Sequence, residues 1–190
     1  SITNSYTDRA YIEKDVQNLL KSGEELFGDE FVSSGGLNYD FSFSNVMNSP
    51  ATVTVALAAR STYTTSNFQV NANNSNIGNF GVYRVGSSQE DVYANYVNTS
   101  LIWNSPTDNI GINLQYQRPD FDARAWVDYV AIQLRRALKY EGVPLYFRAE
   151  ASSATLTSFE LSNANNGLIL MDVTDAMHPV RMNFDGNSFL

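Results

Sequence analysis

The stretch from Arg124 to Leu138 constrains the fold more than any other part of the chain. Apolar residues recur at every fourth position from Trp126, which is compatible with a helix. Read as a strand, the stretch is apolar on both faces, one formed by Trp126, Val130, Ile132 and Leu134 and the other by Val127, Tyr129 and Ala131. Because nearly every other patterned segment alternates with period two, we interpret it as a long central strand.

Alternation elsewhere predicts further strands. It is clearest at residues 37–44, 51–59, 80–85 and 110–116. We expect residues 93–103 and 112–116 to form a hairpin, with Ile110, Ile112, Leu114 and Tyr116 facing inward. We expect PLYFRAE, residues 144–150, and GLILMDVT, residues 167–174, to join the central strand in one sheet, with further strands near Phe159 and from Pro179 onward.

These segments predict an all-β protein, an antiparallel β-sandwich of jelly-roll type with about ten strands and little helix. A short strand is expected at Arg9 to Glu13, and one helical turn at Val16 to Leu20, closed by Gly23. Gly23 and Gly28 are expected to bracket a tight corner that buries Leu26 and Phe27. We expect residues 1–190 to form a single domain, because 43% hydrophobic residues suffice for one core.

The net charge and the composition make some classes of function less compatible with this chain. The net charge of −8 repels phosphate backbones, so no nucleic-acid partner is expected. No apolar run approaches the ~20 residues of a membrane span, and no signal sequence opens the chain. A charged fraction of 17% with many Asn, Ser, Thr and Tyr residues is typical of surface-exposed bacterial β-proteins.

The sequence gives little support for a catalytic site or a metal site. Cysteine is absent, which excludes disulfides, thiolate metal sites and a cysteine nucleophile within these residues. The single histidine, His178, lies in DAMHPV with no recognisable serine elbow, so no catalytic residue is predicted. No cofactor or metal ligand is assigned, although the carboxylates of Asp120, Asp122 and Asp128 leave a structural calcium site open.

Two surfaces are candidates for binding. Tyr93 and Tyr96, beside Asn95 and Asn98, would form a platform on which a sugar ring could stack if they lie at a sheet edge, whereas Trp126 is expected to be buried. The stretch DVTDAMHPV places flexible and branched apolar residues in a turn, and the chain given stops at an apolar residue. These features predict an interface formed by Met171, Met177, Val180 and Leu190.

Three stretches together resemble one family. They are SGEELFGDEF at residues 22–31, RAWVDYVAIQLRRAL at 124–138 and GLILMDVTDAMHPVRM at 167–182. Their order and separation are similar to the region ahead of the peptidase domain in gingipain-type cysteine peptidases, most closely the PorU-type sortases of the type IX secretion system. Leu26 and Met171 stand where that family typically has tryptophan.

The resemblance implies a non-catalytic β-sandwich from a longer protein, with the catalytic Cys and His in a peptidase domain beyond Leu190. It also implies a secreted or cell-surface location at an outer membrane of Bacteroidetes type. The partners implied are the downstream catalytic domain and outer-membrane proteins of the secretion system. The alternative is a carbohydrate-binding or adhesin-type β-sandwich whose partner is a glycan.

Overall fold

A computed structural model of the chain describes residues 2–19, 26–148, 158–165, 167–183 and 188–189. The described residues form strands and turns, which confirms the expected all-β class. None of them belongs to a helix long and apolar enough to cross a membrane.

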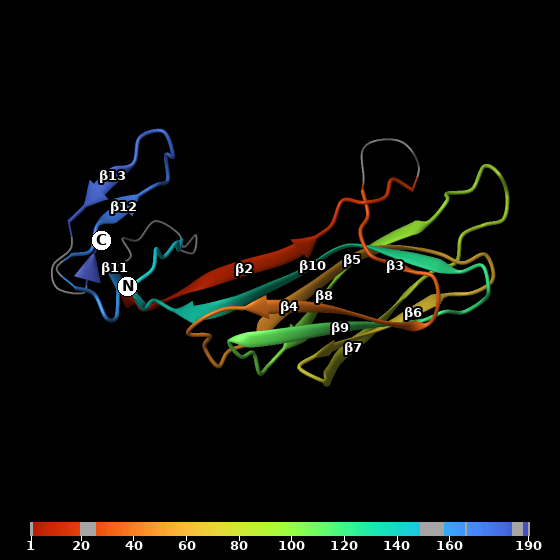
Figure 1. The fold of residues 1–190 in the computed structure, drawn as a ribbon, viewed down its shortest axis with the longest axis horizontal. Coiled ribbons are helices and arrows are strands. Elements are labelled where there is room, and N and C mark those ends of the chain that lie inside the picture. The colour runs from red at the N-terminus through yellow and green to blue at the C-terminus, as the bar shows by residue number, and fades with distance from the viewer. Residues whose placement is uncertain (1, 20–25, 149–157, 166, 184–187, 190) are drawn as a thin grey trace.

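The strands fall into a long set and a short set. The long body contains β2 (Ser5–Glu13), β3 (Glu30–Phe31), β4 (Gly35–Ser42), β5 (Ala51–Arg60), β6 (Ser66–Ala72), β7 (Ser75–Val82), β8 (Asn95–Trp103), β9 (Asn109–Gln117) and β10 (Arg124–Ala137). At one end lie the short strands β1 (Ile2–Thr3), β11 (Ser158–Glu160), β12 (Leu170–Asp172), β13 (Val180–Met182) and β14 (Ser188–Phe189) (Figure 1). We call Ser5–Ala137 the sandwich and the described residues from 138 onward the C-terminal segment.

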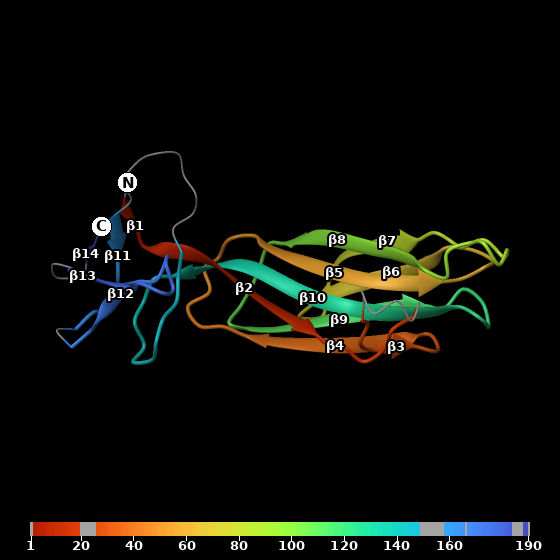
Figure 2. The ribbon, with the colours of Figure 1, turned by 90° about the horizontal axis from the view of Figure 1, so that it is seen from above.

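The sandwich consists of two antiparallel sheets packed face to face. A 5-stranded sheet has the order β2-β10-β5-β8, with β3 also paired to β10, and a 4-stranded sheet has the order β4-β9-β6-β7. The chain passes repeatedly from one sheet to the other, and its last long strand, β10, lies between β2 and β5 (Figure 2). This strand order, which the sequence did not predict, is that of a jelly roll, and it agrees with the expected class of antiparallel β-sandwich.

The core lies between the two sheets and follows directly from the alternation. Val53, Val55 and Leu57 of β5 face Ile110, Ile112 and Leu114 of β9, and all six side chains are buried. Tyr39 and Phe41 of β4 join them, as expected. Burying one such aliphatic or aromatic side chain contributes about 1.5–3 kcal/mol, so this cluster is the main source of stability.

The central strand is confirmed, but the prediction that Trp126 shares a face with Val130 is wrong. A β-bulge places Asp128 as an extra residue between Val127, opposite Leu57, and Tyr129, opposite Ala56. A bulge shifts the side-chain alternation by one residue. Ala125 and Val127 therefore face the core together with Val130, Ile132 and Leu134. Trp126 is buried on the outer face instead, against Phe27 and Ala58.

The expected hairpin between residues 93–103 and 112–116 is also wrong. Strand β8 pairs with β5 in one sheet, whereas β9 pairs with β4 and β6 in the other. The linker between them crosses from sheet to sheet, because both strands must bury an apolar face in the same core. The inward positions of Ile110, Ile112, Leu114 and Tyr116 are confirmed.

A hairpin forms instead between β6 and β7. Ala72 pairs with Ser75, which leaves Asn73 and Asn74 as the turn. Both residues have positive φ, 44° and 68°, which suits asparagine in a two-residue turn. The strand expected at residues 80–85 ends at Val82.

The C-terminal segment departs most from expectation. The described part of PLYFRAE, residues 144–148, is not a strand, and GLILMDVT contributes only β12, which pairs with β13 rather than with β10. The strand near Phe159 exists as β11, between β1 and β14. Neither segment can pair with β10, because the positions on both sides of β10 are already occupied by β2 and β5.

At the N-terminus the expected strand at Arg9 to Glu13 is longer, since β2 begins at Ser5. Residues 16–19 are not helical, and the remainder of the expected helical turn lies outside the described residues. Of the two side chains expected in the Gly23–Gly28 corner, Phe27 is buried whereas Leu26 is exposed, and Gly23 also lies outside the described residues.

Candidate functional site

The C-terminal segment is anchored on one end of the sandwich by a second apolar cluster. Tyr6, Leu138 and Leu161 are buried there, with Leu145, Phe147, Phe159, Leu168 and Leu170 packed around them. Backbone bonds join the same regions: the Leu138 amide donates to the Asn4 carbonyl at 2.7 Å, and the Tyr140 amide donates to the Ser162 carbonyl at 2.9 Å. The segment is therefore packed on the sandwich.

The outermost part of the segment is the hairpin of β12 and β13 with its loop, Leu170–Met182, which we call the end hairpin. Its loop is held by local hydrogen bonds. The Thr174 amide donates to Asp172 Oδ1 at 2.9 Å, and the Met177 amide donates to Asp175 Oδ1 at 3.0 Å. Nδ1 of the His178 ring lies 2.9 Å from Asp175 Oδ2. Such side-chain bonds to nearby backbone order a turn without a core beneath it.

These bonds also set the acidity of the two carboxyl groups. The side-chain hydrogen bond from His178, followed by the Met177 amide, lowers the pKa of Asp175. The side chain and then the amide of Thr174 lower the pKa of Asp172. Both carboxylates are therefore ionised acceptors at neutral pH, and His178 is a turn residue paired with Asp175. This arrangement supplies no catalytic unit.

The end hairpin presents apolar side chains to solvent. Met177 is 83% exposed, Val180 61% and Met171 40%, and the neighbouring Ile169 and Val173 are also exposed. Met171, Met177 and Val180, three of the interface residues expected from the sequence, thus belong to this one hairpin, while Leu190 lies outside the described residues. Met171 pairs with Arg181 and Val180 pairs with Asp172, so Met171 and Val180 face opposite sides of the hairpin. Several exposed apolar residues on one small element can mark a protein interaction site.

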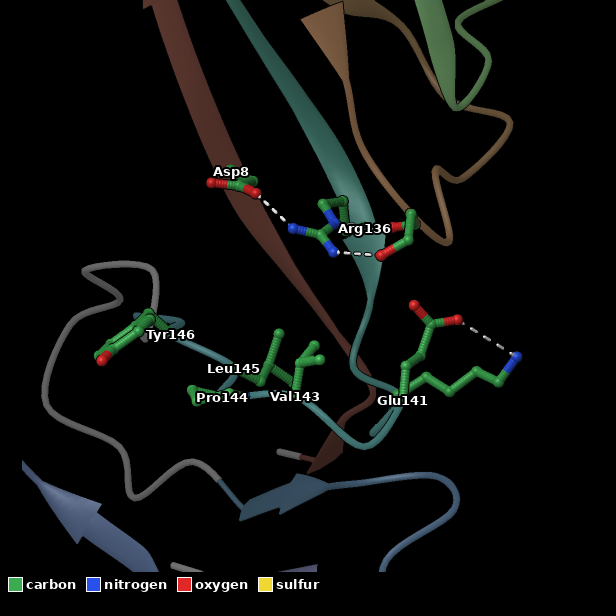
Figure 3. Close-up of a pocket in the computed structure, with 9 residues that line it drawn as sticks. Asp8, Arg136, Glu141, Val143, Pro144, Leu145 and Tyr146 are labelled. Atoms are coloured by element: carbon green, nitrogen blue, oxygen red, sulfur yellow. Dashed lines mark hydrogen bonds and ion pairs between the residues drawn. The ribbon is translucent and has the colours of Figure 1, made fainter.

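A cavity of about 240 Å³ lies where the C-terminal segment meets the sandwich (Figure 3). Arg136 reaches from β10 and donates to Asp8 Oδ2, to the Ser44 carbonyl and to Ser44 Oγ, each at 2.7 Å. Val143, Pro144, Leu145 and Tyr146 line the other side (Figure 3). The Arg136 guanidinium already donates to three acceptor atoms. We therefore interpret the cavity as part of the contact between the sandwich and the C-terminal segment, and we call this contact the joint.

Tyr93 and Tyr96, the aromatic pair considered for a sugar platform, lie just before and on the edge strand β8. Tyr93 and Tyr96 are 41% and 46% exposed, and Tyr96 belongs to the edge strand β8. Both rings also have structural partners. The Arg60 guanidinium lies 4.7 Å over the Tyr93 ring, and the Tyr96 hydroxyl donates to Asp128 Oδ2 at 2.8 Å.

The acidic residues considered for calcium are dispersed. Asp128 holds Tyr96, and Asp120 Oδ2 accepts a hydrogen bond from Ser61 Oγ at 2.6 Å. In the part of the chain that the structure describes, no three Asp, Glu or His side chains come close enough to share a metal ion.

Sequence reasoning missed two features. Arg136 was expected only as part of the central strand, because it follows another arginine, Arg135, and nothing in its sequence neighbours marks it as the one that pairs with Asp8. The Asn and Gln residues that alternate with the core positions of β6 and β9 were also not singled out, and they lie on the outer face of the two central strands of the 4-stranded sheet. Alternation of amides with buried residues was the signal that could have revealed them.

Comparisons with known proteins give a likeness in fold. No protein-family model matches the chain, and no curated protein matches it. A crystal structure of dimeric latent PorU from Porphyromonas gingivalis superposes with a TM-score of 0.81 at 15% sequence identity, over 100% of this chain. This chain spans 19% of the length of that PorU chain. The chain therefore has the fold of a PorU-like region.

Carbohydrate-binding modules are more distant in structure. A CBM35 from Cellvibrio japonicus Abf62 covers 68% of this chain and 97% of its own, at a TM-score of 0.46 and 11% identity. The CBM36-1 domain of a xylanase from the Trinervitermes trinervoides hindgut metagenome covers 66% of this chain and 96% of its own, at a TM-score of 0.43 and 15% identity.

Proposed function

We propose that this chain is a non-catalytic jelly-roll module of a longer gingipain- or PorU-like cysteine peptidase and acts as a docking scaffold. The observation that carries the proposal is the end hairpin, in which Met171 on β12, Met177 in the loop and Val180 on β13 are all exposed. An ordered apolar surface reduces the entropy lost on binding, since its backbone is already fixed.

The fold likeness supports a module of this kind. The chain matches a PorU chain along its whole length but accounts for only 19% of it, which leaves room for a peptidase domain elsewhere in such a protein. That PorU structure is described as latent and dimeric. For this protein we propose that the end hairpin docks on the downstream catalytic domain or on an outer-membrane partner of the secretion system. Such a protein would be secreted or attached to the cell surface.

The contact would have the size of an interdomain interface. Such contacts bury on the order of 600–1,500 Å², enough to fix an orientation while each part keeps its own core. Methionine suits this role because its unbranched side chain adapts to an irregular partner surface. The chain itself would leave peptide substrates intact, since it has no cysteine and His178 is committed to Asp175.

A test uses the longer protein. Met171→Ser together with Met177→Ser removes the exposed thioethers, while Ile102→Ser on β8 removes an exposed apolar side chain from the sandwich as a matched control. After limited proteolysis, the wild-type and control modules should co-elute with the rest of the protein on size exclusion. The double variant should be released. Co-elution of the double variant, or equal release of the control, would contradict docking through the end hairpin.

The second candidate is a carbohydrate-binding or adhesin-type module with a sugar platform at Tyr93 and Tyr96. Their exposure at the edge of the 5-stranded sheet favours it. Saturable glycan binding that Tyr96→Ala abolishes would support this reading over docking. Continuation of the coding sequence beyond Leu190 into a domain with a Cys and a His would support the peptidase module.

A further inference from the structure

The outer surface of the 4-stranded sheet carries a dense array of side-chain amides. Alternate residues of its strands face the core, and those between them face outward. Asp40 is the only charged residue in these strands, in a chain of net charge −8. We call this surface the amide face; its members are Asn38, Asn67, Gln69, Asn71, Asn76, Asn79, Asn109, Asn113, Gln115 and Gln117.

Strand register places these amides in rows across the sheet. Asn113 of β9 stands opposite Asn38 of β4 and Asn71 of β6, and Asn71 stands opposite Asn76 of β7. The next row contains Gln115, Gln69 and Asn79. Directly opposed residues of an antiparallel pair lie on the same face about 4.5–5.5 Å apart, so the rows form a nearly continuous polar grid.

Hydrogen bonds fix the grid in place. Asn71 Nδ2 donates to Asn113 Oδ1 at 3.2 Å, and Asn113 Nδ2 donates to Asn38 Oδ1 at 2.8 Å. Gln69 Nε2 donates to Asn71 Oδ1 and Gln115 Nε2 to Asn113 Oδ1, at 2.8 and 2.7 Å. Each amide has two donor hydrogens and an oxygen with two acceptor sites, so most members keep capacity for a ligand.

A hollow of about 350 Å³ adjoins one end of the grid. It is lined by Asp40, Phe41, Ser42, Asn73, Asn109, Ile110 and Gly111. Gly111 helps to keep it open, because a Cβ there would lie 3.4 Å from Asp40 Oδ1 and 3.8 Å from Asn73 Oδ1. Asn73 is held in position, since its Oδ1 accepts from the Gly111 amide at 2.8 Å and its Nδ2 donates to Thr107 Oγ1 at 2.9 Å.

We propose that the amide face binds a neutral polysaccharide, with one sugar unit in the hollow beside Asp40. Primary amides carry a donor and an acceptor side by side, which matches the paired hydroxyls of a sugar ring. An anionic ligand would find no opposite charge on these strands, whose one charged residue is Asp40, and it would also meet the negative field of the whole protein. The fixed amides lower the ordering cost of binding, and repeated rows suit a repeating polymer.

The site is separate from the surfaces described above. The end hairpin lies at one end of the molecule, and Tyr96 lies on β8 of the other sheet. The proposal thus goes beyond docking through the end hairpin, and either can fail without the other. It also differs from the sugar platform at Tyr93 and Tyr96 in its residues and its face.

The test is affinity electrophoresis of the chain through native gels that contain mannan, galactomannan, arabinoxylan or dextran, with polygalacturonate as the anionic comparator. At least one neutral polysaccharide should retard the protein. Asn113→Ala with Gln115→Ala should lower the association constant about tenfold or more, because several neutral hydrogen bonds are lost. Asn98→Ala, which removes an exposed amide from β8, should bind as the wild type does.

Thermal unfolding of the variants confirms that each retains the fold. The proposal is overturned if none of the neutral polysaccharides retards the protein, if only polygalacturonate does, or if the amide-face variant binds as tightly as Asn98→Ala. It is also overturned if sedimentation velocity shows the wild type to be a dimer that Asn113→Ala with Gln115→Ala dissociates, since the face would then be occupied by a second copy.

Discussion

The sandwich and the C-terminal segment differ in how far they bury their apolar side chains. In the sandwich, β5 and β10 extend over 10 and 14 residues and bury their apolar side chains against a facing sheet. In the C-terminal segment, β12 and β13 have 3 residues each, and Met171, Met177 and Val180 remain exposed. Both regions contain many apolar residues, but the long strands of the sandwich bury one apolar face in a common core, whereas the end hairpin leaves its apolar side chains exposed.

This difference in burial distinguishes residues that stabilise the fold from exposed residues that could contact a partner. The inner strands of the sandwich, such as β5 and β10, are fixed by neighbours on both sides and by the opposite sheet. Among the residues that the structure describes, the end hairpin has one strand pairing, between β12 and β13, and hydrogen bonds to Asp172 and Asp175 order its loop. We therefore expect core substitutions to unfold the molecule, and substitutions in the end hairpin to change binding with little effect on stability.

The largest effect is expected from Ile132→Ala in the sandwich core. Ile132 is fully buried, and truncation of a buried isoleucine costs about 2–5 kcal/mol of unfolding free energy. Urea denaturation followed by tryptophan fluorescence measures the loss. Leu161→Ala, in the smaller cluster of the C-terminal segment, is the matched comparison and should cost less. Equal losses would show that both regions depend on one cooperative core.

A smaller loss is expected from Arg136→Leu at the joint. The substitution leaves Asp8 without its ion pair and removes two bonds to Ser44, so about 1.5–3 kcal/mol should be lost. Arg124→Leu is the control, because its pair with Glu30 is exposed and such pairs contribute at most about 1 kcal/mol. Calorimetry that gave the same melting temperature for both variants would refute a structural role for the joint.

The sandwich should lose stability at high pH through Tyr39. Burial, the nearby negative charge of Asp29 and the hydrogen bond to Asp29 raise the pKa of Tyr39. The protonated form is therefore favoured in the folded state, and its contribution is present below the unfolded value of 10.0 and lost as the pH rises above it. Tyr39→Phe should cost about 0.5–1.5 kcal/mol at neutral pH but flatten the alkaline limb of the stability profile.

The smallest effect on stability is expected in the end hairpin. Asp175→Asn should change the unfolding free energy by less than about 0.5 kcal/mol, as is usual for surface positions. The lowered pKa of Asp175 means that its turn is stabilised above the ordinary value of 3.8 and loosens as the pH falls below it. Carboxyl carbon NMR of the wild type should show Asp175 titrating below 3.8. Titration at or above that value would contradict the bonded turn.

The sequence predicted the sandwich well because alternation records burial residue by residue. Tyr39, Phe41, Val53 and Leu114 could be assigned to the core from their neighbours alone. The bulge at Asp128 could not, because one inserted residue leaves a pattern that still alternates on each side. Its cause is tertiary: at this point the partner of β10 changes from β2 to the segment around Gly28, whose amide donates to the Val127 carbonyl at 2.7 Å.

Strand partners were harder to predict than strands. Residues 95–103 and 109–117 are close in sequence and both alternate, yet β8 and β9 lie in different sheets. Short apolar stretches gave equal difficulty, since Leu145 and Leu168 pack into a cluster without belonging to a strand. The exposure of Met177 could be expected from the sequence, because it lies in the polar turn DAMHPV, where an apolar side chain has no core to enter; the interface itself stays a prediction.

Hydrogen exchange of residues 170–183 is the most direct test of the docking scaffold. The exchange rates are compared between this chain alone and the same residues within the longer protein, with β5 and β10 as internal reference. We predict that amides of the end hairpin exchange more slowly in the longer protein, while those of β5 and β10 are unchanged. Equal exchange of residues 170–183 in both proteins would contradict the account.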